Sequence, residues 1–330
     1  MSHIAVLGLG NFGTAITRLW GDAGHHIQAW TATQEVFDSI HDKGTNEKYL
    51  PGVPLKATVT MDLSAAVSGA DIVVLALPTA VVLELVDNLI PFLKNDQVIL
   101  DLAKGLGPND SLVSKSIREK LKDAGLTNTL CVLTGPTIAT ELAGGVFTTA
   151  LVASSDEAAA RRIVRELSTA TFKLSPTDDP LGAEYWGAFK NVIALACGVS
   201  DGLRDGGFGG DNLKAAIFTA GYQEAVRLLP ELGASRETAL SCAAVGDLYV
   251  TATSPFGRNR QMGERLGRGQ TLEQAQNEMV MVSEGVRAAR MFQRLYRNGG
   301  LSAPFVDAVC ALLDGEMSAV ELVDSVLAGL

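Results

Sequence analysis

Residues 3–20 read HIAVLGLGNFGTAITRLW and contain the pattern that decides the fold of the first half of the chain. The apolar run before the glycines predicts a buried β-strand, and the residues after them predict a helix that follows directly. Gly8, Gly10 and Gly13 have the spacing GxGxxG. Gly8 permits a tight turn, Gly10 lets a diphosphate approach the backbone, and Gly13 lets the helix pack closely against the strand. The stretch therefore predicts the first unit of a dinucleotide-binding domain.

The same alternation continues to about residue 180. Short runs rich in Val, Ile and Leu alternate with amphipathic segments, which is typical of βαβ units around a parallel sheet. The predicted strands are residues 3–7, 27–30, 72–76, 98–102, 131–133, 149–153 and 172–175, and the helices between them are residues 11–23, 79–93, 111–121 and 156–168. We therefore expect a Rossmann-type, doubly wound, mostly parallel α/β sheet that binds NAD(P) over residues 1–180.

Helical periodicity replaces the strand pattern after a turn cluster at residues 176–180. The segments with helical period are residues 183–196, 213–229, 284–297 and 304–313. A chain of 330 residues usually divides into two compact domains. We therefore expect an all-α substrate-binding and catalytic domain over residues 181–330.

Composition excludes several classes of function. The formal net charge of -10 disfavours binding to nucleic acid or to anionic lipid. The four cysteines lie far apart without a CxxC pair, and the four histidines lack metal-ligand spacing, so no metal site is expected. No apolar run reaches the ~18 residues of a membrane span, and no signal-peptide pattern is present, so we expect a cytoplasmic protein.

Cofactor preference depends on the residues after the second strand. NAD-specific domains usually place an acidic residue there, which binds the ribose 2′-hydroxyl. In this chain residues 30–34 read WTATQ, and the first acidic residue is Glu35. No arginine is present to bind a 2′-phosphate, although Thr31 and Thr33 can donate hydrogen bonds to one. The sequence leaves NAD, NADP or dual use open, with a slight preference for NADPH.

A charged residue stands inside the most apolar predicted helix. Residues 182–203 read GAEYWGAFKNVIALACGVSDGL, in which Lys190 and Asn191 interrupt an apolar run. One interpretation is a snorkelling lysine whose stem covers apolar surface while its amine reaches water. The other is a partly buried ammonium that exchanges a proton with a substrate oxygen, because burial disfavours its charged form.

Two further stretches have the composition of a substrate site. Residues 246–260, GDLYVTATSPFGRNR, place Arg258 and Asn259 beside a Gly/Pro loop at a predicted helix start, where a guanidinium and helix-terminal N–H groups can bind a phosphate. A solvated arginine-rich turn is the alternative. Lys104 and the segment 135–137 each follow a predicted parallel strand. Ligands of open α/β sheets bind outside the carboxyl ends of strands, so we expect both to face the nicotinamide and the substrate.

Taken together, these motifs resemble those of the NAD(P)-dependent glycerol-3-phosphate dehydrogenases along nearly the whole chain. The matching landmarks, in order, are GLGNFGTA, NEKYLPG, LPT, KG, GPTIATE, GAFKNVIALACGVSDGL, GDLYVTATSPFGRNR and SEGV. Each landmark alone is modest evidence, but their joint order and spacing are highly specific. The resemblance implies reversible reduction of dihydroxyacetone phosphate to sn-glycerol 3-phosphate for glycerophospholipid synthesis. It also implies a second domain of the 6-phosphogluconate dehydrogenase C-terminal type.

Residue roles follow from the resemblance. Lys190 is implied to donate the proton in reduction and accept it in oxidation, with Asn191 beside it. Lys104 is implied to polarise the substrate oxygen and contact the cofactor, while Asp247 and Thr251 orient the lysines and hydroxyls. The other implied contacts are Gly135, Thr137, Gly257, Arg258 and Asn259 for the substrate, and Gly8, Gly10, Asn11, Phe12, Gly13, Thr31, Ala139, Arg258 and Glu284 for the cofactor.

The chain also departs from the family pattern. Ala220 stands where an arginine is typical, Gly257 where a serine is typical, and Phe147 where a proline is typical. The first change removes a cation from the helical half, which bears on catalytic efficiency, substrate choice and feedback control.

Two other functions remain as alternatives. A β-hydroxy-acid dehydrogenase of the same architecture also uses a Lys–Asn pair, but its carboxylate substrates need no Arg–Asn phosphate loop. A catalytically silent NAD(P)H-binding regulator would not need Lys104, Lys190, Asp247 and Arg258 together. A homodimer through the helical half is compatible with the sequence, and no feature of the sequence determines the oligomeric state.

Overall fold

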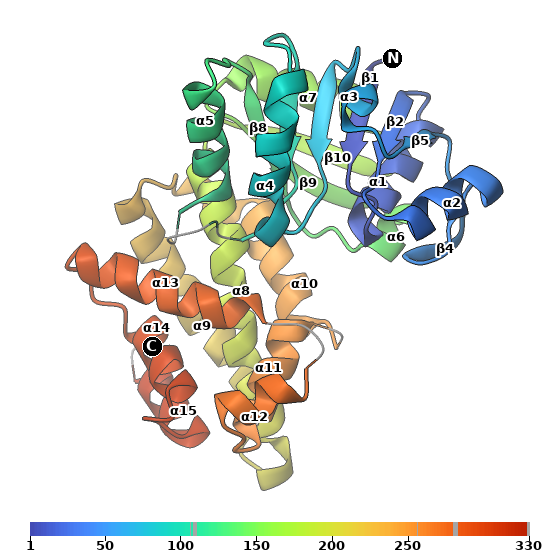
Figure 1. Ribbon diagram of the computed structural model, residues 1–330. Coiled ribbons are helices and arrows are strands. Elements are labelled where there is room, and N and C mark those ends of the chain that lie inside the picture. Colours follow the sequence, from blue (N-terminus) through green and yellow to red (C-terminus); the bar gives the residue numbers. More distant parts are fainter. Residues whose placement is uncertain (106, 108–110, 256, 280–282, 329–330) are drawn as a thin grey trace. The chain divides into compact units, whose positions relative to one another are not determined.

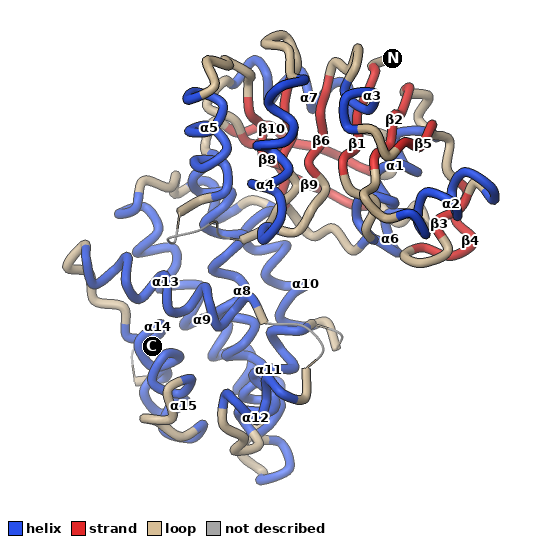
Figure 2. The backbone as a smooth tube through the Cα atoms, viewed as in Figure 1, coloured by secondary structure: helices blue, strands red, loops and turns tan. Residues whose placement is uncertain are grey.

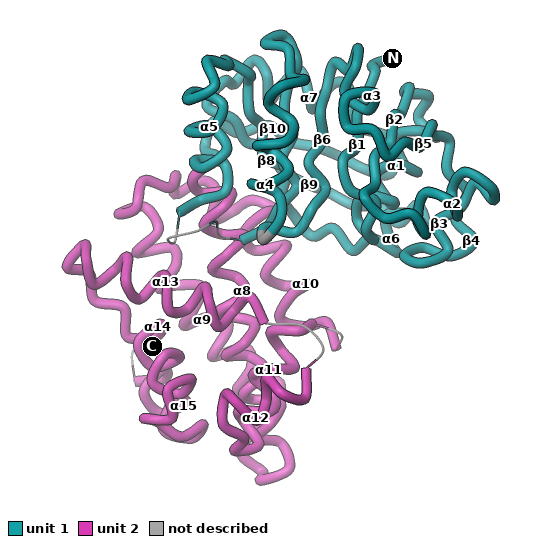
Figure 3. Tube along the Cα trace, in the orientation of Figure 1, with its two compact units in different colours: residues 1–180 teal, residues 181–330 magenta. Residues whose placement is uncertain are grey.

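The computed structural model describes residues 1–105, 107, 111–255, 257–279 and 283–328 (Figure 1). The chain divides into two compact units, Met1–Pro180 and Leu181–Leu330 (Figure 3).

Unit 1 contains an eight-stranded sheet in its described residues, in the order β10-β9-β8-β7-β6-β1-β2-β5. The strands are β1 (His3–Leu7), β2 (His26–Trp30), β5 (Thr58–Thr60), β6 (Ile72–Leu75), β7 (Val98–Asp101), β8 (Leu130–Thr134), β9 (Thr148–Ala153) and β10 (Phe172–Thr177). Neighbouring strands are parallel except β8 and β9, which pair antiparallel. The six strands from β5 to β8 have the doubly wound order of a Rossmann domain, which confirms the predicted fold class.

Helices cover both faces of this sheet. Alternate residues of β1 point to opposite faces: Ile4 and Val6 pack with Trp20 in one apolar core, and Ala5 and Leu7 pack in the other. The helices of unit 1 are α1 (Asn11–Asp22), α2 (Gln34–Lys43), α3 (Leu63–Val67), α4 (Thr79–Leu89), α5 (Val113–Asp123), α6 (Ala139–Ala143) and α7 (Glu157–Leu167), with a 3₁₀ turn η1 (Ile90–Phe92). Burial on both faces explains why these strands read as continuous apolar runs.

Every regular element in the described part of unit 2 is helical, as predicted (Figure 2). The helices are α8 (Pro180–Gly202), α9 (Asp211–Leu228), α10 (Asp247–Thr253), α11 (Arg258–Gly267), α12 (Leu272–Asn277), α13 (Glu284–Asn298), α14 (Pro304–Leu313) and α15 (Ala319–Leu327). Short helical turns are η3 (Arg204–Gly206), η4 (Leu229–Leu232), η5 (Glu237–Leu240) and the π-helix η6 (Cys242–Gly246). Among the described helices, none combines the length and apolarity needed to cross a bilayer.

Close backbone packing joins α8 to α11. A Cβ atom on Gly198 would lie 2.0 Å from the carbonyl oxygen of Arg260, and one on Gly263 would lie 1.8 Å from that of Leu195. One turn further along each helix, a Cβ atom on Gly202 would lie 2.7 Å from the Cα of Gly267. Only glycine permits this approach, so the first turn of α11 is held directly against α8.

The elements that the sequence analysis missed are short or polar. The hairpin of β3 (Thr45–Asn46) and β4 (Leu50–Pro54), the edge strand β5 and the helix α2 lack a continuous apolar run. Helix α8 is longer than the predicted residues 183–196, because its buried apolar pattern continues to Gly202.

Candidate functional site

The glycine turn of unit 1 has the geometry expected of a diphosphate site. Gly8 has a φ of +103°, and a Cβ atom on it would lie 2.6 Å from the Ala76 carbonyl oxygen. A Cβ atom on Gly13 would lie 1.9 Å from the Gly8 oxygen, whereas one on Gly10 would meet nothing within 4 Å. Space beside Gly10 is therefore open at the point where α1 begins, and the first N–H groups of that helix have no acceptor within it. These residues fit a dinucleotide diphosphate.

Asn46 supports this turn and was not identified from the sequence. Its side chain is fully buried, and its Nδ2 donates to the Leu9 carbonyl oxygen and to Thr14 Oγ1, both at 2.9 Å. Thr14 Oγ1 in turn donates to Leu9 O at 3.2 Å. Asn46 is the first residue of the landmark motif NEKYLPG, but only the fold shows that its side-chain amide reaches the glycine turn.

The residues after β2 explain why the cofactor preference is not obvious. Thr31 is buried, and its hydroxyl accepts a hydrogen bond from the Thr33 amide at 3.2 Å. The first acidic residue, Glu35, pairs with Lys48 at 2.5 Å. The carboxylate that could bind a ribose 2′-hydroxyl is thus partly neutralised. Of the other predicted cofactor contacts at this turn, Asn11 is exposed and Phe12 packs against the core.

Lys104 lies with two other predicted substrate contacts. Its Nζ donates to the Gly135 carbonyl oxygen at 2.8 Å and to Thr137 Oγ1 at 3.3 Å. Thr79, in the LPT landmark, donates its hydroxyl to the Lys104 carbonyl oxygen at 2.8 Å. The segments that follow β6, β7 and β8 therefore meet at the carboxyl edge of the sheet, where α/β domains bind ligands. Ala139 follows on the same segment as the first residue of α6.

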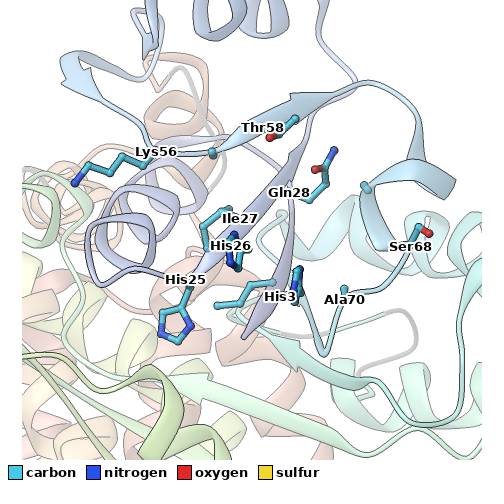
Figure 4. A pocket seen from close by; sticks show the side chains of 12 residues that line it. His3, His25, His26, Ile27, Gln28, Lys56, Thr58, Ser68 and Ala70 are labelled. Carbon is cyan, nitrogen blue, oxygen red and sulfur yellow. The ribbon is translucent and has the colours of Figure 1, made fainter. Parts of the chain in front are cut away.

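A separate cavity of about 400 Å³ lies at the opposite edge of the sheet. Its lining includes His3 at the start of β1, His26 at the start of β2, and Lys56 (Figure 4). The imidazole rings of His3 and His26 stack with their centroids 4.8 Å apart. None of the predicted site residues lines this cavity, because the glycine turn follows the other end of β1.

In unit 2, Lys190 and Asp247 form a buried ion pair. Their side chains are only 7% and 4% exposed. An ion-paired lysine this deeply buried does not fit the snorkelling interpretation, in which the amine extends into water. Lys190 comes from the middle of α8, and Asp247 is the first residue of α10, directly after the π-helical segment η6. Single π-turns occur frequently at functional sites.

Thr251 lies one helical turn after Asp247 and bonds to its backbone. Its hydroxyl donates to the Asp247 carbonyl oxygen at 2.6 Å, one turn earlier in α10. This bond lies within the helix, so it stabilises the segment that carries Asp247. The side chain of Thr251 is half-buried beside that residue.

A chain of buried hydrogen bonds joins the segments of three predicted site residues. Asn259 Nδ2 donates to Asn191 Oδ1 at 2.8 Å. Asn259 Oδ1 accepts from Ser283 Oγ at 2.7 Å and from the Gly285 amide at 2.8 Å. The chain connects α8 next to Lys190, α11 next to Arg258, and α13 next to Glu284. Ser283, which is fully buried, was missed from the sequence because its partner lies 24 residues away.

Arg258 and Glu284 lie at the exposed starts of their helices. Arg258 is the first residue of α11 and Glu284 the first of α13. The first backbone bond within α11 runs from the Gln261 amide to the Gly257 carbonyl oxygen at 2.9 Å. The amides of residues 258–260 therefore have no acceptor inside the helix, an arrangement suited to an anion beside Arg258.

The comparisons agree with this arrangement of motifs. Residues 3–160 match the family model for the N-terminus of NAD-dependent glycerol-3-phosphate dehydrogenase, and residues 179–324 match the model for its C-terminus. The glycerol-3-phosphate dehydrogenase (NAD(P)+) of Moorella thermoacetica is 38% identical over 312 residues, which cover 94% of this chain and 91% of the relative. The enzyme of the same name from Geobacillus kaustophilus is 38% identical over 336 residues, which cover 99% of this chain and 95% of the relative.

A solved structure shows the same similarity in three dimensions. The crystal structure of glycerol-3-phosphate dehydrogenase from Coxiella burnetii superimposes with a TM-score of 0.85 at 28% identity, covering 99% of this chain and 98% of that one. Both units are thus matched by sequence and by structure. The chain belongs to the NAD(P)-dependent glycerol-3-phosphate dehydrogenase family.

Proposed function

We propose that this chain reduces dihydroxyacetone phosphate reversibly to sn-glycerol 3-phosphate with NADH or NADPH, and so supplies the backbone for glycerophospholipid synthesis. Family membership supports the reaction. The observation that carries the proposal is the buried Lys190–Asp247 pair, which lies beside the Asn191–Asn259 hydrogen bond. A buried ammonium and carboxylate in this setting are suited to proton transfer.

When bound, the reduced nicotinamide supplies a hydride to the ketone carbon of the substrate. Negative charge then develops on the ketone oxygen, and Lys190 Nζ donates a proton to it. Asp247 remains a carboxylate throughout and orients the ammonium before transfer. The positive charge of the Lys190 ammonium stabilises the negatively charged oxygen of the transition state more than it stabilises the neutral ketone. The ammonium therefore lowers the barrier. In the oxidation direction Lys190 accepts the hydroxyl proton.

Binding of the substrate phosphate is assigned to the start of α11. Arg258 supplies a guanidinium, and the amides of the first helical turn supply further donors. The Asn259 side chain is already committed to Asn191 and Ser283, so we assign its phosphate contact to the backbone amide.

The remaining roles are proposed for unit 1 and for the cofactor. Lys104 polarises the substrate oxygen and contacts the cofactor. The other proposed contacts are Gly135, Thr137 and Gly257 for the substrate, and Gly8, Gly10, Asn11, Phe12, Gly13, Thr31, Ala139, Arg258 and Glu284 for the cofactor. Residues 1–180 then form the NAD(P)-binding domain and residues 181–330 the substrate-binding and catalytic domain.

A slight preference for NADPH, a cytoplasmic location and a homodimer are further proposals. The Glu35–Lys48 pair supports the first, because it leaves no unpaired carboxylate at that residue to select a 2′-hydroxyl. The location and the oligomeric state rest on the sequence interpretation alone.

The test is an absorbance assay at the reduced-nicotinamide band, with dihydroxyacetone phosphate and each cofactor in turn. We expect the ketone phosphate to be reduced with both cofactors. Faster reduction of β-keto acids would favour the β-hydroxy-acid alternative. Cofactor binding without turnover of any substrate would favour the silent regulator.

Lys190→Ala and Lys190→Arg separate proton transfer from charge. We expect both variants to lower kcat by orders of magnitude while the Kd for the reduced cofactor stays within about twofold. Alanine removes the ammonium that pairs with buried Asp247, whereas arginine keeps a cation there but does not release a proton at neutral pH. Stopped-flow turnover and fluorescence titration measure the two quantities. Near-normal kcat in Lys190→Arg would remove the proton-donor role.

A further inference from the structure

Arg260 lies two residues after Arg258 and ties the loop before it to α8. Its Nε donates to the Ser254 carbonyl oxygen at 3.0 Å, and its NH2 donates to the Pro255 carbonyl oxygen at 3.2 Å. Its NH1 donates to Asp201 Oδ2 at 2.5 Å. The planar guanidinium thus has three hydrogen-bond acceptors, two in the loop after α10 and one in α8, and its NH2 also lies 3.5 Å from a Glu264 carboxylate oxygen within α11.

Asp201, near the end of α8, accepts the hydrogen bond from Arg260. Its side chain is 8% exposed, and Lys214 of α9 donates to its other oxygen at 2.7 Å. Burial by itself would raise the pKa of Asp201, but the hydrogen bonds from Lys214 and Arg260 outweigh it and hold that pKa below its usual value. The carboxylate is therefore charged at neutral pH, and its ion pairs join α8 to α9 and to α11.

Close backbone contact between α8 and α11 also limits the position of the start of α11. Gly198 leaves room for the Arg260 carbonyl oxygen, because any Cβ atom there would lie 2.0 Å from it. The first turn of α11 therefore cannot move toward α8, and the Asp201 contact prevents it from moving away. Arg258 belongs to the same turn, so its backbone is held from both sides.

We propose that Asp201 and Arg260 are positioning residues that fix the Arg258 segment for binding of the substrate phosphate. They act through Arg258 and do not touch the substrate. This inference rests on the proposed function, since it needs a phosphate-bearing substrate. Asp201 and Arg260 both lie within landmark motifs, but the family resemblance implied no role for either residue.

The experiment compares dihydroxyacetone phosphate with unphosphorylated dihydroxyacetone in Asp201→Asn and Arg260→Lys. Misplacement of Arg258 should lower kcat/KM for the phosphorylated ketone about 10- to 100-fold, mainly through KM, and leave that for dihydroxyacetone within about twofold. Arg260→Lys keeps the charge but loses the fork that reaches Ser254 and Pro255, so it carries the test even if Asp201→Asn does not fold.

Glu224→Gln is the matched control. Glu224 is also a buried carboxylate of unit 2, but it accepts the Phe305 and Val306 amides at the start of α14, at 2.8 Å and 3.0 Å. We expect this variant to lower Tm and leave the ratio of the two kcat/KM values unchanged. If Asp201→Asn and Arg260→Lys acted only by lowering stability, they would leave the ratio of the two kcat/KM values as unchanged as Glu224→Gln does.

A double-mutant cycle completes the test. If Asp201 acts through Arg258, adding Asp201→Asn to Arg258→Ala should cost less than about twofold further in kcat/KM for dihydroxyacetone phosphate. The positioning role would be overturned if the effects of Asp201→Asn and Arg258→Ala on kcat/KM multiplied in the double variant. It would also be overturned if the single variants Asp201→Asn and Arg260→Lys left the ratio of the two kcat/KM values unchanged. The proposed function would stand in both cases. Absence of turnover by the wild-type chain would overturn both.

Discussion

At the residue scale, the three glycines of the first turn meet different steric conditions. Gly8 and Gly13 have backbone atoms where a Cβ atom would lie, whereas Gly10 has none within 4 Å. Gly10 also has a φ of -71°, a conformation that any residue adopts. The fold alone therefore does not require glycine at residue 10, which fits the diphosphate contact proposed for it.

This difference predicts opposite results for two alanine substitutions. Gly10→Ala should keep the wild-type Tm but weaken binding of NADH and NADPH, because the added methyl group meets only the diphosphate. Gly13→Ala should lower Tm by several degrees, because its Cβ atom would collide with the Gly8 carbonyl oxygen. Thermal unfolding and fluorescence titration of the cofactor check both. Equal cofactor affinity in Gly10→Ala and wild type would contradict the diphosphate assignment.

Arg258→Ala should chiefly weaken substrate binding. A charge-assisted hydrogen bond to phosphate contributes about 1.5–3 kcal/mol, so KM for dihydroxyacetone phosphate should rise roughly 10- to 100-fold. Arg268→Ala is the control, since Arg268 follows the other end of the same helix, where it pairs with Glu264. Initial-rate kinetics measure both variants. An unchanged KM in Arg258→Ala would remove Arg258 from the phosphate site.

At the element scale, two buried carboxylates of the helical unit have pKa values displaced in opposite directions. Asp201 faces Lys214, Arg260 and Arg204, and its pKa is lowered because the first two hydrogen bonds outweigh burial. Glu224 caps α14, and burial raises its pKa because two amide donors and the distant Arg227 do not compensate. Only the first carboxylate is therefore more acidic in the folded state than in the unfolded state.

The two groups should affect the free energy of unfolding in opposite ways as pH changes. The stability that Asp201 contributes is present above its unfolded pKa of about 3.8 and is lost as the pH falls through its lower folded pKa. Asp201→Asn should therefore have a lower free energy of unfolding than wild type at neutral pH, and this difference should disappear in acid. Glu224 contributes stability below about 4.5 and loses it as the pH rises through its raised folded pKa. Urea unfolding of both variants from pH 3 to 7 measures the curves; parallel curves would contradict the assignments.

At the scale of the whole molecule, the chain divides into two units that each have extensive internal packing. Both apolar clusters around the sheet consist of residues from unit 1 alone. A segment that contains its own core is expected to fold independently.

We therefore expect residues 1–180 expressed alone to unfold cooperatively and to bind NADH, with no reduction of dihydroxyacetone phosphate. Lys190, Asp247 and Arg258 lie outside this fragment, so it lacks the proposed proton donor and phosphate contact. Circular dichroism during heating and titration of cofactor fluorescence test the two properties. Turnover by the fragment would contradict the assignment of catalysis to residues 181–330.

Sequence by itself predicted the elements whose physics is local. The buried strands β1, β6 and β7 are continuous apolar runs, and α1 begins directly after Gly10. The polar edge strand β5 and the hairpin of β3 and β4 were missed, because neighbouring chain segments stabilise them more than their own composition does. The motif residues Lys104, Lys190 and Arg258 were predicted from their unusual surroundings and from the family resemblance.

Only the tertiary structure decided which side chains support those motifs. Asn46 reaches the glycine turn, Ser283 reaches Asn259, and Asp201 reaches Arg260 across 59 residues of sequence. Each is an ordinary polar residue whose role depends on a partner that the chain brings close only when it folds. A hydrogen bond or ion pair requires atoms within about 3 Å, and sequence spacing does not specify that distance between separate helices.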